Sequence, residues 1–433
     1  MYTELDENTI RDISFKKREP EWMCEFRLKS LKRFEELDMP KFGPKLDIDF
    51  SSINYYKKTQ ENVSTWDKVN CSIRDTFDKL GVIDAEKKYL DGVTNQYESE
   101  VVYHKLGAEL EEKGIIFLST DDALKKYPDL FFKYFNSLVK YDENKFTALN
   151  GALWSGGSFI YIPPHTKLDR PLQSYFRIDS MALGQFERTI IIVDDYSELS
   201  YIEGCTAMSY SVNSLHAGVV EIYVGKNAHV RYSTIQNWSK DVYNLVTKRA
   251  IVLDGGLMEW VDGNVGSGVT MKYPSCILKG NDSKGNSISI AYAKEGQVLD
   301  AGAKMIHIGK NTKSKIISKS IASNGGIANY RGQVKIGKSA TNSESYIKCD
   351  TIILDENSKS DTYPLNIVSN NSSTLEHEAS VSKISEDKLF YLMSKGLKEE
   401  EAKELVVAGF IDDFKKELPM EYAVELNRLL KEI

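Results

Sequence analysis

The sequence predicts a mainly β protein, built around a right-handed parallel β-helix with helical domains on either side. From about residue 154 to residue 374, turn-like runs of Gly, Asp, Asn, Ser and Lys recur, and each leads into an apolar alternating run. Within these runs apolar residues alternate at spacing two, which is typical of strands rather than helices. The residues that close the turns recur at gaps of 31, 28, 28, 28 and 28 residues: Tyr201, Tyr232, Trp260, Ile288, Ile316 and Glu344.

A fixed period of this size indicates a repeat architecture. One repeat cannot bury its own apolar face, so successive repeats must stack on one another. The length of the periodic region predicts about seven to eight coils. A β-sandwich is the alternative fold for the same alternating strands.

Composition excludes several classes of protein. The 433 residues are enough for two or three domains, and the content of 41% hydrophobic and 27% charged residues is ordinary for a globular chain. The net charge of −7 argues against a nucleic-acid binder, and no apolar run is long enough to span a membrane. The acidic N-terminus resembles no targeting signal. Five cysteines with no C-x-x-C pair fit reduced thiols in the cytoplasm rather than a disulfide framework or a structural zinc site.

The first segment, residues 1–150, is predicted to be a mostly helical domain. Helical spacing of apolar residues marks residues 19–37, 69–82 and 119–138. Gly81 is expected to end the second of these helices, and Ser119 or Thr120 to cap the third. These helices are expected to cap one end of the stack, because open strand edges promote aggregation.

The β-helix is predicted to occupy residues 151–378, and a helical domain to follow at residues 379–433. The apolar period changes there to about 3.6 residues. One helix is expected to start at Ser385 and end near Gly396, a second to cover residues 398–410, and a third to begin at Pro419. The pattern alone leaves open whether this domain is a cap or a docking surface for a partner.

The run GQVKIGKS, from Gly332 to Ser339, matches the phosphate-binding loop of nucleoside triphosphatases. That chemistry requires a helix after the loop, whose N-terminus faces the phosphates. Here a strand-like run follows instead, and Lys338 occupies the same repeat position as Lys226 and Lys310. We therefore interpret the run as a corner of the repeat.

Cys205 and Cys349 are candidates for chemistry, although a lone buried cysteine is most often a small hydrophobic residue. A functional role would use the thiolate, as a sulfur acceptor or a soft metal ligand. The 144 residues between them correspond to about five coils, or roughly 25 Å along the axis. The two thiols could not share one metal ion in a single chain, but they could mark the two ends of a route.

Glu376, His377 and Glu378 form a cluster of possible metal ligands. In a strand the two glutamates would face one way and the histidine the other. All three could converge on one ion only with a bend or with a second subunit. The alternative is a solvated polar strand end.

The chain resembles the SufB/SufD family of the SUF iron–sulfur cluster assembly system. The resemblance runs from about residue 15 to the C-terminus and is densest after Trp154. IEGCTA, IQNW, and KCD followed by LEHEA resemble the SufB branch rather than the SufD branch. Other runs that carry the resemblance are SGGSFIYIPP, QSYFRIDS, GQFERTIIIVDD, SLHAGVVEI, YNLVTKRA, MKYPSCIL, AGAKMIHIGKNT, YRGQVKIGKSA and LEHEASVSKISEDKLFYLMSKGLKEEEA.

The resemblance implies a scaffold protein and not an enzyme. It implies a complex with the ATPase SufC, docked on the C-terminal helices, and with SufD or a second copy of this chain at the β-helix ends. ATP would then belong to SufC. Sulfur would arrive as persulfide from a cysteine desulfurase through a sulfur carrier, and the finished iron–sulfur cluster would pass to apo-proteins. A reduced flavin is associated with some complexes of the family, and no flavin motif is visible in this sequence.

The same resemblance assigns roles to individual residues. Cys205 matches the family's sulfur acceptor, and Cys349 matches the cysteine of the nascent-cluster site. The acidic–His–acidic run beside that site corresponds to Glu376, His377 and Glu378. The interior residues of the sulfur path correspond to Arg177, Gln236, Trp238 and Lys248. Two other hypotheses remain: a structural subunit in the SufD role that holds no cluster, and an ATPase that uses Lys338.

Overall fold

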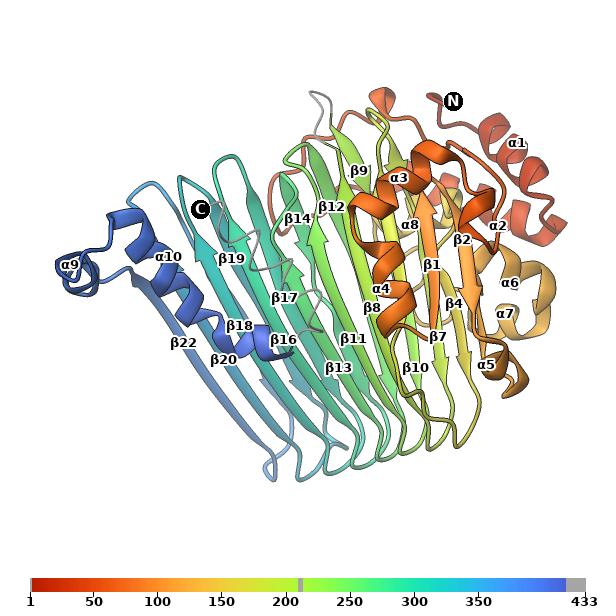
Figure 1. Ribbon diagram of the computed structural model, residues 1–433. Helices are drawn as coiled ribbons and strands as arrows, with labels where there is room; N and C mark the ends of the chain where they lie inside the picture. Colours follow the sequence, from red (N-terminus) through yellow and green to blue (C-terminus); the bar gives the residue numbers. More distant parts are fainter. Residues whose placement is uncertain (1, 209–212, 418–433) are drawn as a thin grey trace.

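The computed structural model confirms the predicted fold class, a parallel β-helix of about eight turns with helices at both termini (Figure 1). It describes residues 2–208 and 213–417. Two long sheets face each other across the interior. The strands of the 10-stranded sheet are, in spatial order, β2 (Glu100–Leu106), β1 (Gly92–Tyr97), β5 (Leu172–Ile178), β8 (Glu198–Ala207), β11 (His229–Asn237), β13 (Leu257–Asn264), β16 (Lys284–Ala293), β18 (Lys313–Ala322), β20 (Glu344–Ile353) and β22 (Thr374–Lys383).

The 12-stranded sheet forms the opposite wall. Three short strands lie beside its main path: β6 (Gly184–Gln185), β9 (Ser214–His216) and β15 (Ser275–Leu278). The strands of the main path are, in spatial order, β21 (Thr362–Val368), β19 (Ile327–Ile336), β17 (Val298–His307), β14 (Val269–Lys272), β12 (Val242–Val252), β10 (Val219–Val224), β7 (Arg188–Val193), β4 (Ser158–Ile162) and β3 (Ile116–Ser119).

The predicted spacing of 28 residues between turns after Tyr232 is wrong in detail. Tyr201, Tyr232 and Trp260 are direct partners on neighbouring strands, as expected. The next partner is Ser287 and not Ile288, and Glu344 lies three residues before Ile347, which is the true partner in β20. The turns between the strands differ in length, so the number of residues per coil varies. The strands nevertheless stay in continuous register.

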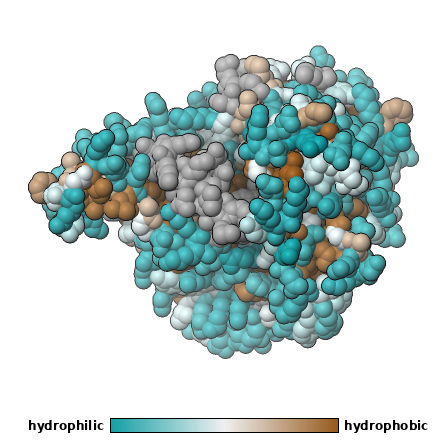
Figure 2. All heavy atoms as spheres, in the orientation of Figure 1, coloured by the Kyte–Doolittle hydropathy of each residue, from teal (hydrophilic) through white to brown (hydrophobic). Residues whose placement is uncertain are grey.

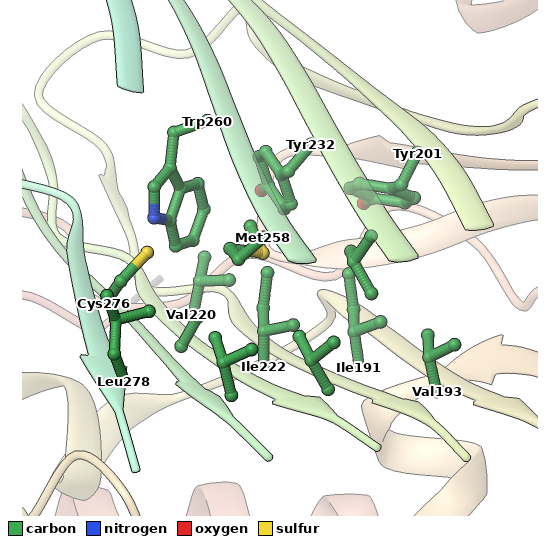
Figure 3. Close-up of a cluster of buried hydrophobic side chains, with 14 of the residues drawn as sticks. Ile191, Val193, Tyr201, Val220, Ile222, Tyr232, Met258, Trp260, Cys276 and Leu278 are labelled. Carbon is green, nitrogen blue, oxygen red and sulfur yellow. The ribbon is translucent and has the colours of Figure 1, made fainter. Parts of the chain in front are cut away.

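The interior is filled by side chains that alternate inward along both sheets. Tyr201, Tyr232 and Trp260 project from the 10-stranded sheet, with neighbouring ring centroids 4.9 and 5.2 Å apart. Figure 3 shows these rings lying over aliphatic side chains of the 12-stranded sheet, such as Ile222. Cys276 of β15 points toward Trp260 within this apolar region. Stacking of the coils therefore buries the apolar face of each repeat.

Trp260→Ala is expected to lower the free energy of unfolding by about 3–5 kcal/mol, because Trp260 is fully buried and its loss leaves a large cavity. Urea denaturation of the two proteins would measure the difference. Phe15→Ala is the control, because Phe15 is 81% exposed, and it should change stability by less than about 0.5 kcal/mol. Equal losses in the two variants would contradict this role of the aromatic interior.

The N-terminal helices cover the outer faces of the first coils. Phe131 and Trp154 pack on Ile190 and Ile192 of the 12-stranded sheet, while Phe77 packs against the outer face of the β1–β2 hairpin. The edge strands at this end are β2 and β3, each paired antiparallel with its neighbour, so strands rather than the predicted helices end the two sheets. The helices are α1 (Glu7–Lys17), α2 (Glu21–Glu36), α3 (Cys71–Lys79), α4 (Val82–Tyr89), α5 (Ala108–Glu112), α6 (Thr120–Lys126), α7 (Pro128–Tyr134) and α8 (Lys145–Leu153).

The C-terminal helices are α9 (Glu386–Ser394), α10 (Glu399–Phe410) and α11 (Asp412–Glu417). Ser385 caps α9 as predicted, and Gly396 follows it with a positive φ of 100°. Val407, Ile411 and Phe414 pack on the outer face of the 10-stranded sheet, so α10 and α11 lie across that sheet (Figure 1). The helix predicted from Pro419 lies outside the described residues.

The C-terminal end of the β-helix is open. Strands β21 and β22 each pair on one side only within the described part of the chain, and most of their residues are exposed. Their apolar side chains include Leu365 and Val381, which are 50% and 51% exposed. The beginning of the β-helix is therefore covered, whereas its last coil presents unpaired strand edges and part of its interior.

Three exclusions from the sequence can be compared with the structure. The glycine-rich run at Gly332 is followed by the turn at Lys338 and then by strand β20, so a strand and not a helix follows the loop. All five cysteines are free. Among residues 2–208 and 213–417, no helix has the length and hydrophobicity needed to cross a membrane.

Candidate functional site

Cys205 lies in the interior of the β-helix, on strand β8. It is 1% exposed and is the register partner of Phe176 on one side and Gln236 on the other. Because strand side chains alternate, Glu203 points to the same side as Cys205. The thiol donates a weak hydrogen bond to the Glu203 carboxylate, with Sγ and Oε1 3.9 Å apart.

A buried ion pair holds Glu203 in place. Lys248 Nζ, on the opposite sheet, donates to Glu203 Oε1 at 3.0 Å, and both side chains are at most 1% exposed. The Tyr232 hydroxyl donates to the other carboxylate oxygen. Burial raises the pKa of Glu203, but Lys248 and Tyr232 outweigh that effect and keep the pKa below its ordinary value. The pair is therefore charged although both side chains are buried.

A second ion pair lies beside the first. Lys272 Nζ donates to Asp262 Oδ1 at 3.1 Å, and both side chains are buried. Burial lowers the pKa of Lys272, and the nearby Lys248 charge adds to this effect. Two ammonium groups thus face the interior close to Cys205. Each ammonium is paired with a carboxylate, so the two pairs place four buried charges close to Cys205.

Gln236 and Trp238 complete the wall around Cys205. Gln236 Oε1 accepts a hydrogen bond from Asn244 Nδ2 at 2.5 Å, and the Trp238 ring lies 4.7 Å from the His216 ring. His216 Nε2 is 2.7 Å from Glu187 Oε2. Burial opposes protonation of His216, but Glu187 outweighs it and raises the histidine pKa. We call Cys205, Glu203, Lys248, Lys272, Asp262, Gln236, Trp238, Asn244 and His216 the Cys205 cluster.

Arg177 does not lie with the other residues assigned to the sulfur path. It is the register partner of Thr206, one residue beyond the Phe176–Cys205 pair, so its side chain projects from the outer face of the sheet. There its guanidinium bonds to Asp179 Oδ1 at 2.5 Å and to Thr206 Oγ1 at 3.0 Å. Gln236, Trp238 and Lys248 share the interior with Cys205, and Arg177 does not.

Cys349 lies at the other end of the interior, on β20. It is 3% exposed, next to the last coil, and its thiol contacts the Tyr330 hydroxyl. Burial raises the pKa of Cys349 to about 12, although the Tyr330 hydrogen bond partly opposes the shift. At neutral pH the thiol is protonated, so iron binding there must displace a proton.

The Glu376–Glu378 run divides between two faces, as strand geometry predicts. His377 is the partner of Ile347 and points inward, where its Nδ1 lies 3.0 Å from Asn366 Nδ2. Glu376 and Glu378 are the partners of Tyr346 and Lys348 on the outer face, and both are exposed. Cys349 and His377 therefore face the same interior, and the two glutamates do not.

The two thiols are far apart. Five strand steps separate β8 from β20, which is about 24 Å at about 4.8 Å a step and agrees with the estimate from sequence. In the described part of the chain, no three His, Cys, Asp or Glu side chains form a group that could hold a metal ion. Cys349 and His377 therefore do not make such a group by themselves within the described residues.

Sequence reasoning missed most of the Cys205 cluster. Glu203, Asn244, Lys272, Asp262 and His216 were given no functional role. The sequence could have indicated Glu203, because it stands two residues before Cys205 and the two side chains must lie on the same face of the strand. The others lie on separate strands, and only the register brings them together.

Fold and site together define a β-helix protein whose partly charged interior holds three buried thiols, two of them, Cys205 and Cys349, at distant points. Comparison with known families agrees: the SUF system FeS cluster assembly SufBD core domain matches residues 176–410, and the SufBD N-terminal region matches residues 2–174. An iron–sulfur cluster assembly SufBD family protein of Staphylococcus saprophyticus is 59% identical over 429 residues, covering 99% of this chain and 92% of the relative. A protein of the same description from Staphylococcus aureus is 60% identical with the same coverage. The chain belongs to the SufBD family of iron–sulfur cluster assembly proteins. Membership of this family implies a SufBCD-type complex.

Proposed function

We propose that this chain is the SufB-like scaffold of its complex: it accepts sulfur at Cys205 and builds a nascent iron–sulfur cluster at Cys349. The observation that carries the proposal is the Cys205 cluster, in which a buried thiol lies 3.9 Å from a carboxylate that is ion-paired to Lys248. A purely structural subunit would need no such charges in its interior, because burying them costs free energy.

Sulfur loading is a transfer without net oxidation. The Cys205 thiolate attacks the outer sulfur of the donor persulfide, a new S–S bond forms, the donor S–S bond breaks, and the donor leaves as a thiolate. Burial and the neighbouring Glu203 carboxylate raise the pKa of the Cys205 thiol well above its ordinary value, so the proton lost by Cys205 passes to the departing donor thiolate. Lys248 then faces the anionic persulfide. The donor is a cysteine desulfurase with its sulfur carrier.

At the other end, Cys349 and His377 are the interior ligands for iron. Glu376 and Glu378 would join them only if β22 rearranged or a partner covered the open end. SufD, or a second copy of this chain, would fit there, because β21 and β22 present unpaired edges. The persulfide sulfur must gain two electrons to become cluster sulfide, so the complex also requires a reductant such as a dithiol or a reduced flavin. The completed cluster would be transferred to apo-proteins.

The ATPase SufC would dock on the C-terminal helices and supply ATP hydrolysis, so this chain itself would not be an enzyme. Helix α9 exposes Phe390, Tyr391 and Met393, which are 75%, 60% and 43% exposed (Figure 2). Exposed aromatic side chains on one short helix are typical of an interface. The free thiols favour a cytoplasmic location.

Sulfur loading tests the proposal. After incubation of the complex with a cysteine desulfurase, its sulfur carrier and cysteine, we expect about one sulfane sulfur per wild-type chain and about tenfold less in Cys205→Ser, because only a thiol can carry it. Cys276→Ser is the control, since that buried cysteine lies in the apolar region away from the charged residues. Absence of sulfane sulfur from a well-folded wild-type complex would favour the SufD-like structural subunit instead.

A further inference from the structure

A chain of four buried polar side chains begins at an ion pair and ends beside Cys205. We call it the His216 chain, and each of its members is at most 1% exposed. Its members, in order of contact, are Glu187, His216, Asn244 and Gln236. Gln236 is the register partner of Cys205 on the neighbouring strand, so the last amide of the chain lies directly next to the thiol.

His216 has an acceptor at each of its ring nitrogens. Nε2 lies 2.7 Å from Glu187 Oε2, and Nδ1 lies 2.8 Å from Asn244 Oδ1. Burial opposes protonation of the ring, but the Glu187 carboxylate, helped by the more distant Glu203 charge, outweighs burial and raises the histidine pKa. Glu187 therefore favours the doubly protonated ring, in which both nitrogens donate hydrogen bonds.

The Nδ1 donor of His216 sets the orientation of two amides. Because Asn244 Oδ1 accepts from His216, Asn244 Nδ2 faces the other way, where it donates to Gln236 Oε1 at 2.5 Å and to Thr270 Oγ1 at 3.4 Å. This bond engages the oxygen of the Gln236 amide and leaves its Nε2 group to face elsewhere. If Nδ1 accepted instead, both amides would reverse, and Gln236 would expose its oxygen in place of its donor.

Two buried donors beside Cys205 lack an acceptor. Gln236 Nε2 and Trp238 Nε1 have no hydrogen-bond partner among residues 2–208 and 213–417. Buried polar groups are almost always paired, so two unused donors next to one thiol indicate an acceptor that the free thiol does not supply. The outer sulfur of a persulfide on Cys205, in its anionic form, is such an acceptor.

We propose that His216 is a positioning residue for the Cys205 persulfide: through Asn244 it holds the Gln236 amide with Nε2 as a hydrogen-bond donor to the outer sulfur anion. The inference rests on the proposed loading of sulfur at Cys205. Hydrogen bonds to the charged form of an acid favour that form and lower the pKa of the acid. The His216 chain therefore keeps the persulfide ionised, and breaking the chain raises the persulfide pKa.

Charged side chains also act on the sulfur at Cys205, so the test must hold them constant. They are Glu203, Glu187, Lys248 and Lys272. The test therefore compares His216→Gln with His216→Asn in the complete complex, because both variants keep these four side chains and both remove the imidazole and its charge. Any difference between the two variants then comes from their hydrogen bonds.

The two variants break the His216 chain at opposite ends. The short asparagine amide places an N–H group where Nδ1 was, so it still donates to Asn244, but it leaves the buried Glu187 without a partner. The longer glutamine amide reaches Glu187 and leaves Asn244 without its donor. His216→Asn should therefore be the less stable variant in urea denaturation, whereas only His216→Gln should lose the orientation of the Gln236 amide.

The readout is the pKa of the Cys205 persulfide. Each complex is loaded by a cysteine desulfurase and its sulfur carrier, separated from both, and titrated anaerobically without iron. The near-ultraviolet absorbance of the persulfide anion follows its ionisation, and sulfane sulfur per chain normalises the signal. We expect the persulfide pKa in His216→Gln to lie about one unit above that in His216→Asn, which is about a tenfold loss of anion at a pH below both values.

Two further variants test the link itself. Asn244→Leu removes the link but keeps the ion pair of His216 with Glu187, and it should raise the persulfide pKa by about one unit relative to wild type. In a Gln236→Met background the difference between the two His216 variants should disappear, because His216 then has no amide to position.

Equal persulfide pKa values in the two His216 variants, or a wild-type value in Asn244→Leu, would overturn the inference and leave sulfur loading at Cys205 standing. A higher pKa in His216→Asn, the less stable variant, would reduce His216 to a structural role. A difference that persists in the Gln236→Met background would show that His216 does not act through Gln236. A well-folded wild-type complex that holds no sulfane sulfur would overturn both this inference and the proposed function.

Discussion

Replacing Cys349 with serine is expected to lower the iron and acid-labile sulfide bound per chain by about tenfold or more, measured after anaerobic co-expression with the ATPase, the partner subunit and the sulfur donors. Iron–sulfur clusters are held by cysteine thiolates, and a serine hydroxyl does not ionise under these conditions. Cys349 is the thiol that faces the interior beside His377 at the open end. Of the two proposed interior ligands, the His377 imidazole alone remains in the Cys349→Ser variant.

The acid–base state of Cys349 adds a second expectation to the same experiment. Burial raises its pKa to about 12, so iron must displace a proton, and binding should strengthen as pH rises. Cys71→Ser is the control, because Cys71 is exposed at the start of α3 and should leave the cluster unchanged. Equal cluster in wild type and Cys349→Ser would move the ligands elsewhere and refute this assignment.

The sequence predicted features that depend on local alternation. The spacing of two within strands identified the β-helix, and it placed His377 on the opposite face from Glu376 and Glu378, as observed. Helix boundaries with strong local signals, such as Ser385 and Gly396, were also correct. These features depend on residues a few positions apart in the chain, so they can be inferred from a single sequence.

Features that depend on the register between strands were harder to predict from the sequence. Ile288 and Glu344 satisfy a constant period, but turns of unequal length shift the true partners to Ser287 and Ile347. Arg177 was assigned to the interior path, and only its pairing with Thr206 reveals that it projects outward. The position of α10 and α11 across the 10-stranded sheet likewise depends on contacts between Phe414 and distant strands. The spacing of residues along the chain does not determine which residues become partners on neighbouring strands or where the helices pack.

Replacing Glu203 with glutamine is expected to destabilise the protein by about 3–5 kcal/mol, because it leaves the buried Lys248 ammonium without its ion-pair partner. Urea denaturation would measure the loss. Lys313→Met is the matched control. It breaks the ion pair with Glu344, whose atoms are 2.9 Å apart, but both side chains are more than half exposed, so the cost should be below about 1 kcal/mol.

The double variant Glu203→Gln/Lys248→Met separates stability from function. Removing both charges removes the unpaired ammonium, so stability should return to within about 1–2 kcal/mol of wild type. Sulfur loading at Cys205 should stay low in the double variant, because the thiol has lost its charged hydrogen-bond acceptor and the persulfide has lost the facing cation. A double variant as unstable as Glu203→Gln would show that the unpaired lysine is not the cause. A double variant that loads sulfur normally would show that the ion pair serves the fold alone. Recovery of stability without recovery of loading is the result expected if the charges are kept in the interior for sulfur transfer.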